Sequence, residues 1–186
     1  GVGATVSPIS MSPPTEESPI FPVVLRCESL VDPLGIDSLA PRLSWKLEAD
    51  GHVRNQVQTA YRLRVATSPD LLSRDAAALW DSDKVSSNDQ LHLEYAGRSL
   101  KSGERCYWNV EVWDGKGLKS IPSVVSWWEM GLLDSDDWTG YWISDGKQPL
   151  EEDADHYEED PAPLFRRSFH LNKEVKRARL YMAAIG

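Results

Sequence analysis

Carboxylates are densest between Glu151 and Asp160, where seven acidic residues fall within ten positions. Glycoside hydrolysis needs a pair of carboxyl groups, one of them kept protonated by a partly apolar pocket. Because these acids repel one another and lack apolar neighbours, we predict a solvated acidic loop over residues 146–162 instead. Asp153 and Asp155 are the candidate ligands for a hard cation such as Ca²⁺, but the run lacks the glycine of an EF-hand loop. We expect neither a metal nor a cofactor.

Eight tryptophans are the second chemical feature of the chain. An exposed indole can stack on the C–H face of a sugar, whereas a covered one packs in a core or an interface. Trp45 and Trp108 share strand faces with aliphatic residues, so we predict that both lie in the core. Four others are candidates for contact with a sugar or a neighbouring domain, two roles that the sequence leaves open: Trp113, Trp127, Trp138 and Trp142.

The other reactive side chains are scattered. The four histidines have no metal-ligand spacing on one expected strand face. Cys27 and Cys106 are too few for a structural zinc site and form either one disulfide or two buried thiols. Gly-x-Ser-x-Gly, GxGxxG and Walker sequences are absent. We therefore predict no catalytic residue in this chain.

The elements that carry these residues are predicted to be short strands. From Cys106 to Trp113, apolar and polar side chains alternate strictly, and Asp114–Gly117 is a hairpin-turn sequence before a return strand over 124–130. Similar alternation predicts strands at 23–27 (Val23, Leu25 and Cys27 on one face), 42–48, 61–65 and 91–93, with a helical turn within 71–79. About seven antiparallel strands without a long helix predict an all-β sandwich of the immunoglobulin or fibronectin-III type.

The chain divides into three predicted regions. Residues 1–21 are rich in proline and serine, which predicts a flexible leader. Residues 22–132 hold the strands of the sandwich. Residues 133–186 are expected to begin a second β-domain, with strands at 138–143, 164–171 and 175–185. Three strands in a segment of about 50 residues bury little core, so this second domain is expected to be incomplete or to pack on the first.

The formal net charge is −9 and the isoelectric point about 4.9. An acidic chain repels phosphate backbones and anionic lipids, so we expect no nucleic-acid and no membrane partner. No apolar run approaches the roughly 20 residues that span a bilayer. A neutral ligand such as a sugar stays compatible with this composition, and the compartment is unknown.

Part of the sandwich resembles fibronectin type III modules. Trp45, Tyr61 and the Leu-Lys-Ser-Gly run at 100–103, which leads into an alternating strand, match positions of that module. Cys106 departs from it, because the module usually places there a tyrosine whose hydroxyl bonds to nearby backbone. We therefore expect another group to hold this corner.

A longer, ordered set of segments resembles the opening of bacterial-type α-L-rhamnosidases of glycoside hydrolase family 78. The segments are PLGID (33–37), PRLSWKL (41–47), QTAYRLRVATSPDLL (58–72), LWDSDKV (79–85), CYWNVEVWDGKG (106–117), SWWEMGLL (126–133), DWTGYWI (137–143), FRRSFHL (165–171) and VKRARLYMAAIG (175–186). The resemblance implies that the catalytic carboxylates lie in an (α/α)₆ barrel elsewhere in the protein. The parent enzyme would hydrolyse terminal α-L-rhamnosyl residues with inversion, and this part would have a structural, domain-packing role.

The resemblance also implies the partners of this chain, namely the remaining domains of the same enzyme and, as a further possibility, rhamnose-containing glycans. Two other functions are alternatives to this role in a rhamnosidase. An independent carbohydrate-binding or adhesion module would need an exposed aromatic platform. A small enzyme would need a convergent acid, base and nucleophile, which the sequence lacks.

Overall fold

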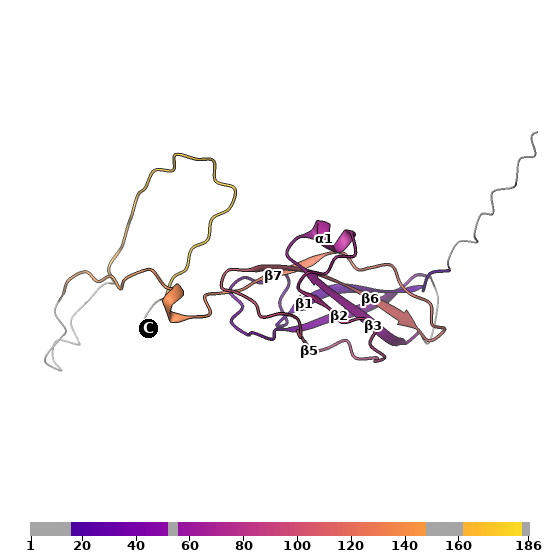
Figure 1. The fold of residues 1–186 in the computed structure, drawn as a ribbon. Coiled ribbons are helices and arrows are strands. Elements are labelled where there is room, and N and C mark those ends of the chain that lie inside the picture. The colour runs from indigo at the N-terminus through magenta and orange to yellow at the C-terminus, as the bar shows by residue number, and fades with distance from the viewer. Residues whose placement is uncertain (1–15, 52–55, 148–161, 184–186) are drawn as a thin grey trace, which may run out of the picture. The chain divides into compact units, whose positions relative to one another are not determined.

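A computed structural model describes residues 16–51, 56–147 and 162–183. In these residues seven strands form two antiparallel sheets. Figure 1 draws the strands as arrows. The three-stranded sheet has the order β1-β2-β5: β1 Ile20–Cys27, β2 Arg42–Ala49 and β5 Leu93–Glu94. The four-stranded sheet has the order β4-β3-β6-β7: β4 Trp80–Asp81, β3 Gln58–Ala66, β6 Arg105–Asp114 and β7 Ser126–Glu129. The predicted all-β immunoglobulin-like sandwich is confirmed.

The core lies between the two sheets and is built by the alternation of side chains along each strand. On β6, Cys106, Trp108, Val110 and Val112 are fully buried, as predicted. Trp45 enters the same core from β2 with 2% of its surface exposed, so both predicted core tryptophans are confirmed. Burying one large apolar side chain stabilises a fold by about 1.5–3 kcal/mol, which makes this cluster the main source of stability.

The alternation on β1 was predicted correctly for Leu25 and Cys27, which are buried, but not for Val23. Its pairing with β2 shifts register between Val23 and Arg26, and Val24 is the extra residue of a β-bulge with φ of 49°. The bulge reverses the phase of the strand, so Ile20 and Leu25 are both buried. Strand β1 also begins at Ile20, inside the region predicted as a leader. A period-two pattern cannot reveal a bulge, because it assumes one partner for every residue.

Tyr95 holds the corner that Cys106 leaves without a phenol. Its hydroxyl lies 2.9 Å from the carbonyl oxygen of Arg98 and 3.2 Å from that of Leu79. Its ring packs edge-on against Trp80, with 5.4 Å between the ring centroids. The expectation that a different group closes this corner is therefore confirmed.

Two local predictions were only partly correct. The helical turn within 71–79 exists as α1 Pro69–Ser73, but it ends before the alanines because Asp75 takes a left-handed conformation with φ of 56°. The return strand begins at Ser126 and not at residue 124, and Val124, which was predicted to lie in this strand, is 80% exposed outside it.

Contacts between Cα atoms separate the chain into two units, Gly1–Thr139 and Gly140–Gly186. The first ends just after a short 3₁₀ helix, η1 Ser135–Asp137. In the described part of the second unit, no strand forms, so the strands predicted at 138–143, 164–171 and 175–185 are absent from residues 138–147 and 162–183. Leu164 and Phe169 are 100% and 74% exposed. Strands need neighbours for their hydrogen bonds and a second layer to bury their apolar face, and neither is present in these residues.

Candidate functional site

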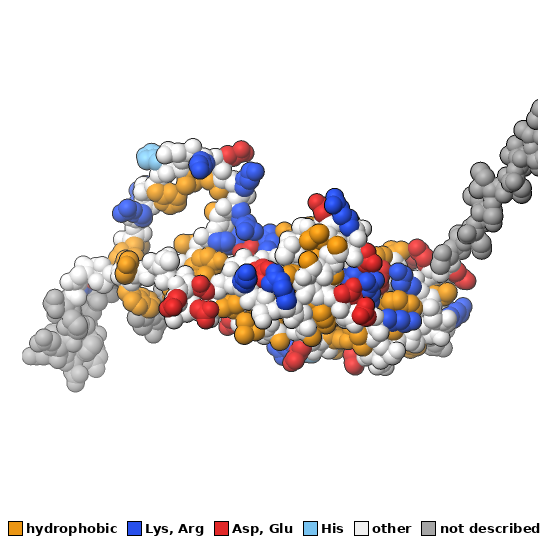
Figure 2. Space-filling model, viewed as in Figure 1, with side chains coloured by type: hydrophobic (Ala, Val, Ile, Leu, Met, Phe, Trp, Pro, Cys, Tyr) orange, Lys and Arg blue, Asp and Glu red, His pale blue; other side chains and the backbone are white. Residues whose placement is uncertain are grey.

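The outer face of the four-stranded sheet carries a group of paired charges. Arg62 and Glu111 lie opposite each other on β3 and β6, as do Arg64 and Asn109. Arg64 and Glu111 are only 5% and 4% exposed. Figure 2 shows basic and acidic side chains side by side over this region of the domain. We refer to Arg62, Arg64, Asp75, Asp81 and Glu111 as the charged cluster.

Hydrogen bonds and ion pairs connect the members of the charged cluster. Arg62 donates to both carboxylate oxygens of Asp81, at 2.9 Å from Nε and 2.6 Å from Nη2. Asp75 lies just after α1, and its Oδ1 is 2.5 Å from Arg64 Nη1. The other terminal nitrogen of Arg64, Nη2, lies 3.7 Å from Glu111 Oε1. The hydrogen bond from Arg62 holds the pKa of Asp81 below its ordinary value. A general acid needs a raised pKa, so Asp81 is unsuited to that role.

Trp113 and Trp127 lie on the same outer face, on β6 and β7, and each is half-buried beneath a cation. Lys84 Nζ lies 4.6 Å from the ring centroid of Trp113. The Arg105 guanidinium lies 4.0 Å from the ring centroid of Trp127. The same guanidinium forms an ion pair with Glu129 at 2.9 Å. A cation over an aromatic face is attracted by the ring quadrupole. It also occupies the face on which a sugar would stack.

The other two predicted aromatic site residues lie outside the strands of the sandwich. Trp138 is 45% exposed in the first unit, and Trp142 is 72% exposed in the second. Asp153 and Asp155 lie outside the described residues. Within residues 16–51, 56–147 and 162–183, no group of three His, Cys, Asp or Glu side chains is placed to hold a metal ion. No helix in those ranges is long and apolar enough to cross a membrane.

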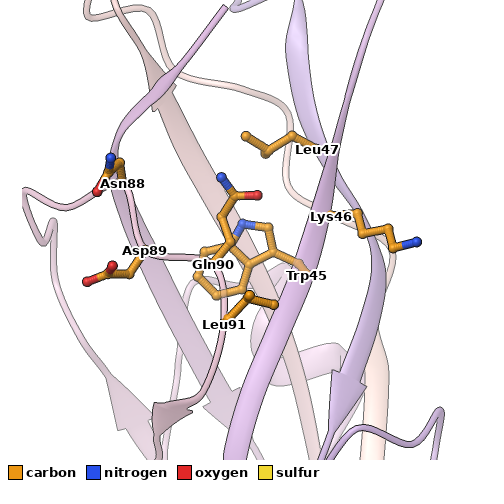
Figure 3. A pocket seen from close by; sticks show the side chains of 7 residues that line it. All are labelled: Trp45, Lys46, Leu47, Asn88, Asp89, Gln90 and Leu91. Atoms are coloured by element: carbon orange, nitrogen blue, oxygen red, sulfur yellow. The ribbon is translucent and has the colours of Figure 1, made fainter.

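A shallow hollow beside β2 was not predicted from the sequence. It is lined by Trp45, Lys46, Leu47, Asn88, Asp89, Gln90 and Leu91 (Figure 3). Trp45 forms its floor, but its indole is almost fully covered and Nε1 donates to Gln58 Oε1 at 3.1 Å. Gln58 in turn donates to the carbonyl oxygens of Ser87 and Asp89. The hollow therefore has a polar wall and one carboxylate, without an exposed aromatic platform.

Cys27 and Cys106 are buried free thiols in the structure, which corresponds to the second of the two alternatives left by the sequence. Burial raises the pKa of each thiol to about 12. A thiolate is the reactive form of cysteine, so neither residue is suited to act as a nucleophile at neutral pH.

Two antiparallel sheets around a core with Trp45 and Trp108, closed by a tyrosine-held corner, define an immunoglobulin-like β-sandwich domain. The comparison with protein families shows which family of immunoglobulin-like domains this is. A family model described as the Rha78A-like, N-terminal immunoglobulin domain matches residues 22–134, and the chain belongs to this family.

The relatives with this domain are much longer enzymes. An α-L-rhamnosidase of Streptomyces avermitilis is 44% identical over 120 residues, which cover 64% of this chain and 11% of that protein. An α-L-rhamnosidase of Formosa agariphila is 33% identical over 183 residues, covering 88% of this chain and 18% of that protein. The second alignment extends outside residues 22–134, so the similarity is not limited to the immunoglobulin domain. The chain spans less than a fifth of the length of these relatives.

Two solved structures agree with the sequence relatives. The crystal structure of the Streptomyces avermitilis α-L-rhamnosidase in complex with L-rhamnose has a TM-score of 0.63 at 40% identity, covering 67% of this chain and 12% of that chain. The α-L-rhamnosidase of Dictyoglumus thermophilum has a TM-score of 0.63 at 36% identity, covering 66% and 14%. In both, the similarity covers a small part of a much longer chain.

Proposed function

We propose that this chain is a non-catalytic N-terminal part of an α-L-rhamnosidase and that its role is to pack against and support the rest of that enzyme. The observation that carries the proposal is the match of residues 22–134 to an N-terminal immunoglobulin domain, in relatives of which the chain spans 18% or less. The whole protein would hydrolyse terminal α-L-rhamnosyl residues, with its catalytic carboxylates elsewhere in the polypeptide.

The requirements of inverting glycosidases support a non-catalytic role for this chain. Their acid and base stand roughly 6.5–9.5 Å apart on either side of a water-filled substrate site. The hollow beside β2 has one carboxylate in its lining, that of Asp89. The carboxylates of the charged cluster are paired with Arg62 and Arg64 on a sheet face. Neither place supplies the acid–base pair.

Hydrolysis of 4-nitrophenyl α-L-rhamnopyranoside tests this proposal directly. The 186-residue chain is expected to release no nitrophenol above the buffer blank, while the longer polypeptide that contains it releases it readily. Turnover by the 186-residue chain, abolished by Asp89→Asn, would contradict the proposal. Absence of hydrolysis by the longer polypeptide would reject the assignment of the parent enzyme.

We also propose a domain organisation in which residues 22–132 are the immunoglobulin-like domain and residues 133–186 contribute strands to a second β-domain. Phe165, Phe169 and Leu171 share one face of an expected strand, as do Ala178, Leu180 and Met182, and this supports strands there. These side chains would be buried by strands from other parts of the enzyme. Amide hydrogen exchange is the test, with slow exchange expected at 164–171 in the longer polypeptide and fast exchange in the 186-residue chain.

Glycan binding is a second candidate function, favoured by the exposed indoles of Trp138 and Trp142. A sugar bound on either ring would change its fluorescence. Titration of the 186-residue chain with L-rhamnose is expected to give no saturable change under the packing proposal. A saturable change that Trp138→Ala or Trp142→Ala removes would establish the binding module instead.

A further inference from the structure

Six aliphatic side chains are exposed around the place where β1 and β7 lie next to each other. They come from β1, from the loop after it and from the segment before β7: Val24, Leu30, Val31, Leu34, Val124 and Val125, with 41–80% of their surface exposed. We call this group the seam patch. Large apolar patches on a soluble domain mark interaction sites more often than isolated exposed side chains do.

Hydrogen bonds bring the three segments together. Asp32 Oδ1 accepts from Ser126 Oγ at 2.8 Å and from the backbone N–H of Trp127 at 3.0 Å. Val31 directly precedes Asp32, and Val125 directly precedes Ser126, so this contact holds the two valines near each other. The backbone N–H of Glu129 donates to the Pro33 carbonyl oxygen at 2.9 Å, which fixes the residue before Leu34 beside β7.

The end of β1 belongs to the same region. Leu30 exchanges two backbone hydrogen bonds with Cys27, each of 2.9 Å, and so folds back on the last residue of the strand. Strand β1 itself contacts β7. Hydrogen bonds therefore connect residues 27–33 to residues 126–129, and Val24, Val124 and Val125 lie within three residues of these segments.

The backbone at Val24 is a second, independent observation. A β-branched residue with φ of 49° is in a left-handed conformation that such side chains avoid. The bulge turns Val24 outwards, so a strained residue presents an apolar side chain to solvent. Strained residues of this kind are retained where the surroundings fix them, and they cluster at sites of interaction.

The charges beside the seam patch are already used within the domain. Arg26 Nη1 donates to the Ser29 carbonyl oxygen at 2.9 Å, and Glu28 forms an ion pair with Arg42 at 2.7 Å. Asp32 accepts the two hydrogen bonds described above. Little charge is left to recognise an ionic partner, so the surface favours an apolar one.

We infer that the seam patch is the surface through which this domain docks on another domain of the same polypeptide, and that the docking face is aliphatic. The inference rests on the proposed function and identifies the surface that performs it. Relatives of which this chain spans 18% or less have several hundred further residues from which such a face can come. An intramolecular partner also explains how exposed valines and leucines are tolerated on a domain of this size.

The test compares charge substitutions in the longer polypeptide and in the 186-residue chain. Val31→Glu combined with Val125→Glu places two carboxylates in the seam patch. Leu91→Glu is the matched control, since Leu91 is 68% exposed beside the hollow. In the longer polypeptide we expect the double variant to speed proteolytic release of the domain at least about tenfold, because a desolvated charge disfavours docking. The control is expected to leave the rate unchanged.

In the 186-residue chain, the double variant should leave the thermal unfolding midpoint unchanged, because Val31 and Val125 are already 60% and 42% exposed. If the double variant does lower that midpoint, the release experiment on the longer polypeptide is done with Val124→Glu instead, because Val124 is the most exposed residue of the seam patch. Equal release rates for the seam and control variants would overturn the inference, even if the parent enzyme is an active rhamnosidase. Concentration-dependent dimers of the 186-residue chain that the double variant dissociates would overturn it in favour of a second copy.

Discussion

The Tyr95 hydroxyl donates a hydrogen bond to the carbonyl oxygen of Arg98, with 2.9 Å between the two oxygens. This contact lies at the corner where immunoglobulin-like sandwiches use a tyrosine on the strand that follows in the sequence, at the position of Cys106 here. Burial raises the pKa of Tyr95 to about 12, so the hydroxyl stays a donor throughout the neutral range. Stability at this corner therefore depends on one phenol.

Replacing Tyr95 with phenylalanine is expected to lower the free energy of unfolding by about 1–2 kcal/mol. The variant keeps the ring and removes both hydrogen bonds of the hydroxyl, while the Leu79 carbonyl oxygen still accepts from the Arg98 N–H at 3.1 Å. Urea unfolding followed by tryptophan fluorescence measures the change. Tyr107→Phe is the control, because the Tyr107 hydroxyl makes no hydrogen bond to any described residue, and it should change stability by less than about 0.5 kcal/mol. Equal effects of both substitutions would contradict this role.

Gly97→Ala should destabilise the same corner by steric overlap. A Cβ atom at this position would lie 2.4 Å from the Leu79 carbonyl oxygen and 2.4 Å from the Tyr95 hydroxyl. Overpacking of this kind typically destabilises by about 1–3 kcal/mol. Gly115→Ala is the matched control, since its Cβ would have only an ordinary contact of 3.6 Å with Val57. A thermal unfolding midpoint of Gly97→Ala equal to that of the control would show that the corner adapts.

The ion pair between Arg62 and Asp81 gives stability a defined pH dependence. The folded-state pKa of Asp81 is below its unfolded value, because Arg62 donates to the carboxylate. Its contribution is therefore complete above about pH 4 and is lost as the pH falls through the folded pKa. Asp81→Asn should lower the free energy of unfolding by about 1 kcal/mol at pH 7, and by less as the pH is reduced below 4. Denaturant titrations at several pH values measure the free energy of unfolding, and the control Asp50→Asn, at an exposed site, should change it without this dependence on pH. A loss of stability in Asp81→Asn that is the same at every pH would refute the ionic explanation.

The two thiols should be inert in the folded chain. Burial raises the pKa of Cys27 and of Cys106 to about 12, so almost no thiolate forms at pH 8. We expect no reaction with 5,5′-dithiobis(2-nitrobenzoate) in native buffer and two equivalents on unfolding in guanidinium chloride. Rapid labelling of either thiol in the native chain would contradict the burial of these strands.

The sandwich could be predicted because its long strands obey simple alternation. On β6 each second residue is apolar, and the structure buries those side chains as expected. The role of Tyr95 had a signal that was missed, since Tyr95 continues the alternation of Leu91 and Leu93. The bulge at Val24 had none, because it is set by pairing with a distant strand.

The outer face was harder to predict than the core. The sequence places Trp113 and Trp127 on this face, and the structure agrees, but the cations over their rings come from residues outside that pattern. The contact between Arg64 and Asp75 depends on where α1 ends. Alternation also predicted strands after residue 138 that the described residues do not form, because a strand pattern does not supply the neighbours that a sheet needs.

The most direct test of the packing role is deletion of residues 22–132 from the longer polypeptide, with kcat and the thermal inactivation rate measured together. The account predicts much faster inactivation, with a kcat of the surviving folded enzyme within about twofold of the parent value, since the chemistry lies elsewhere. A kcat reduced more than about 100-fold at unchanged thermal stability would contradict it, because the domain would then supply a group to the reaction.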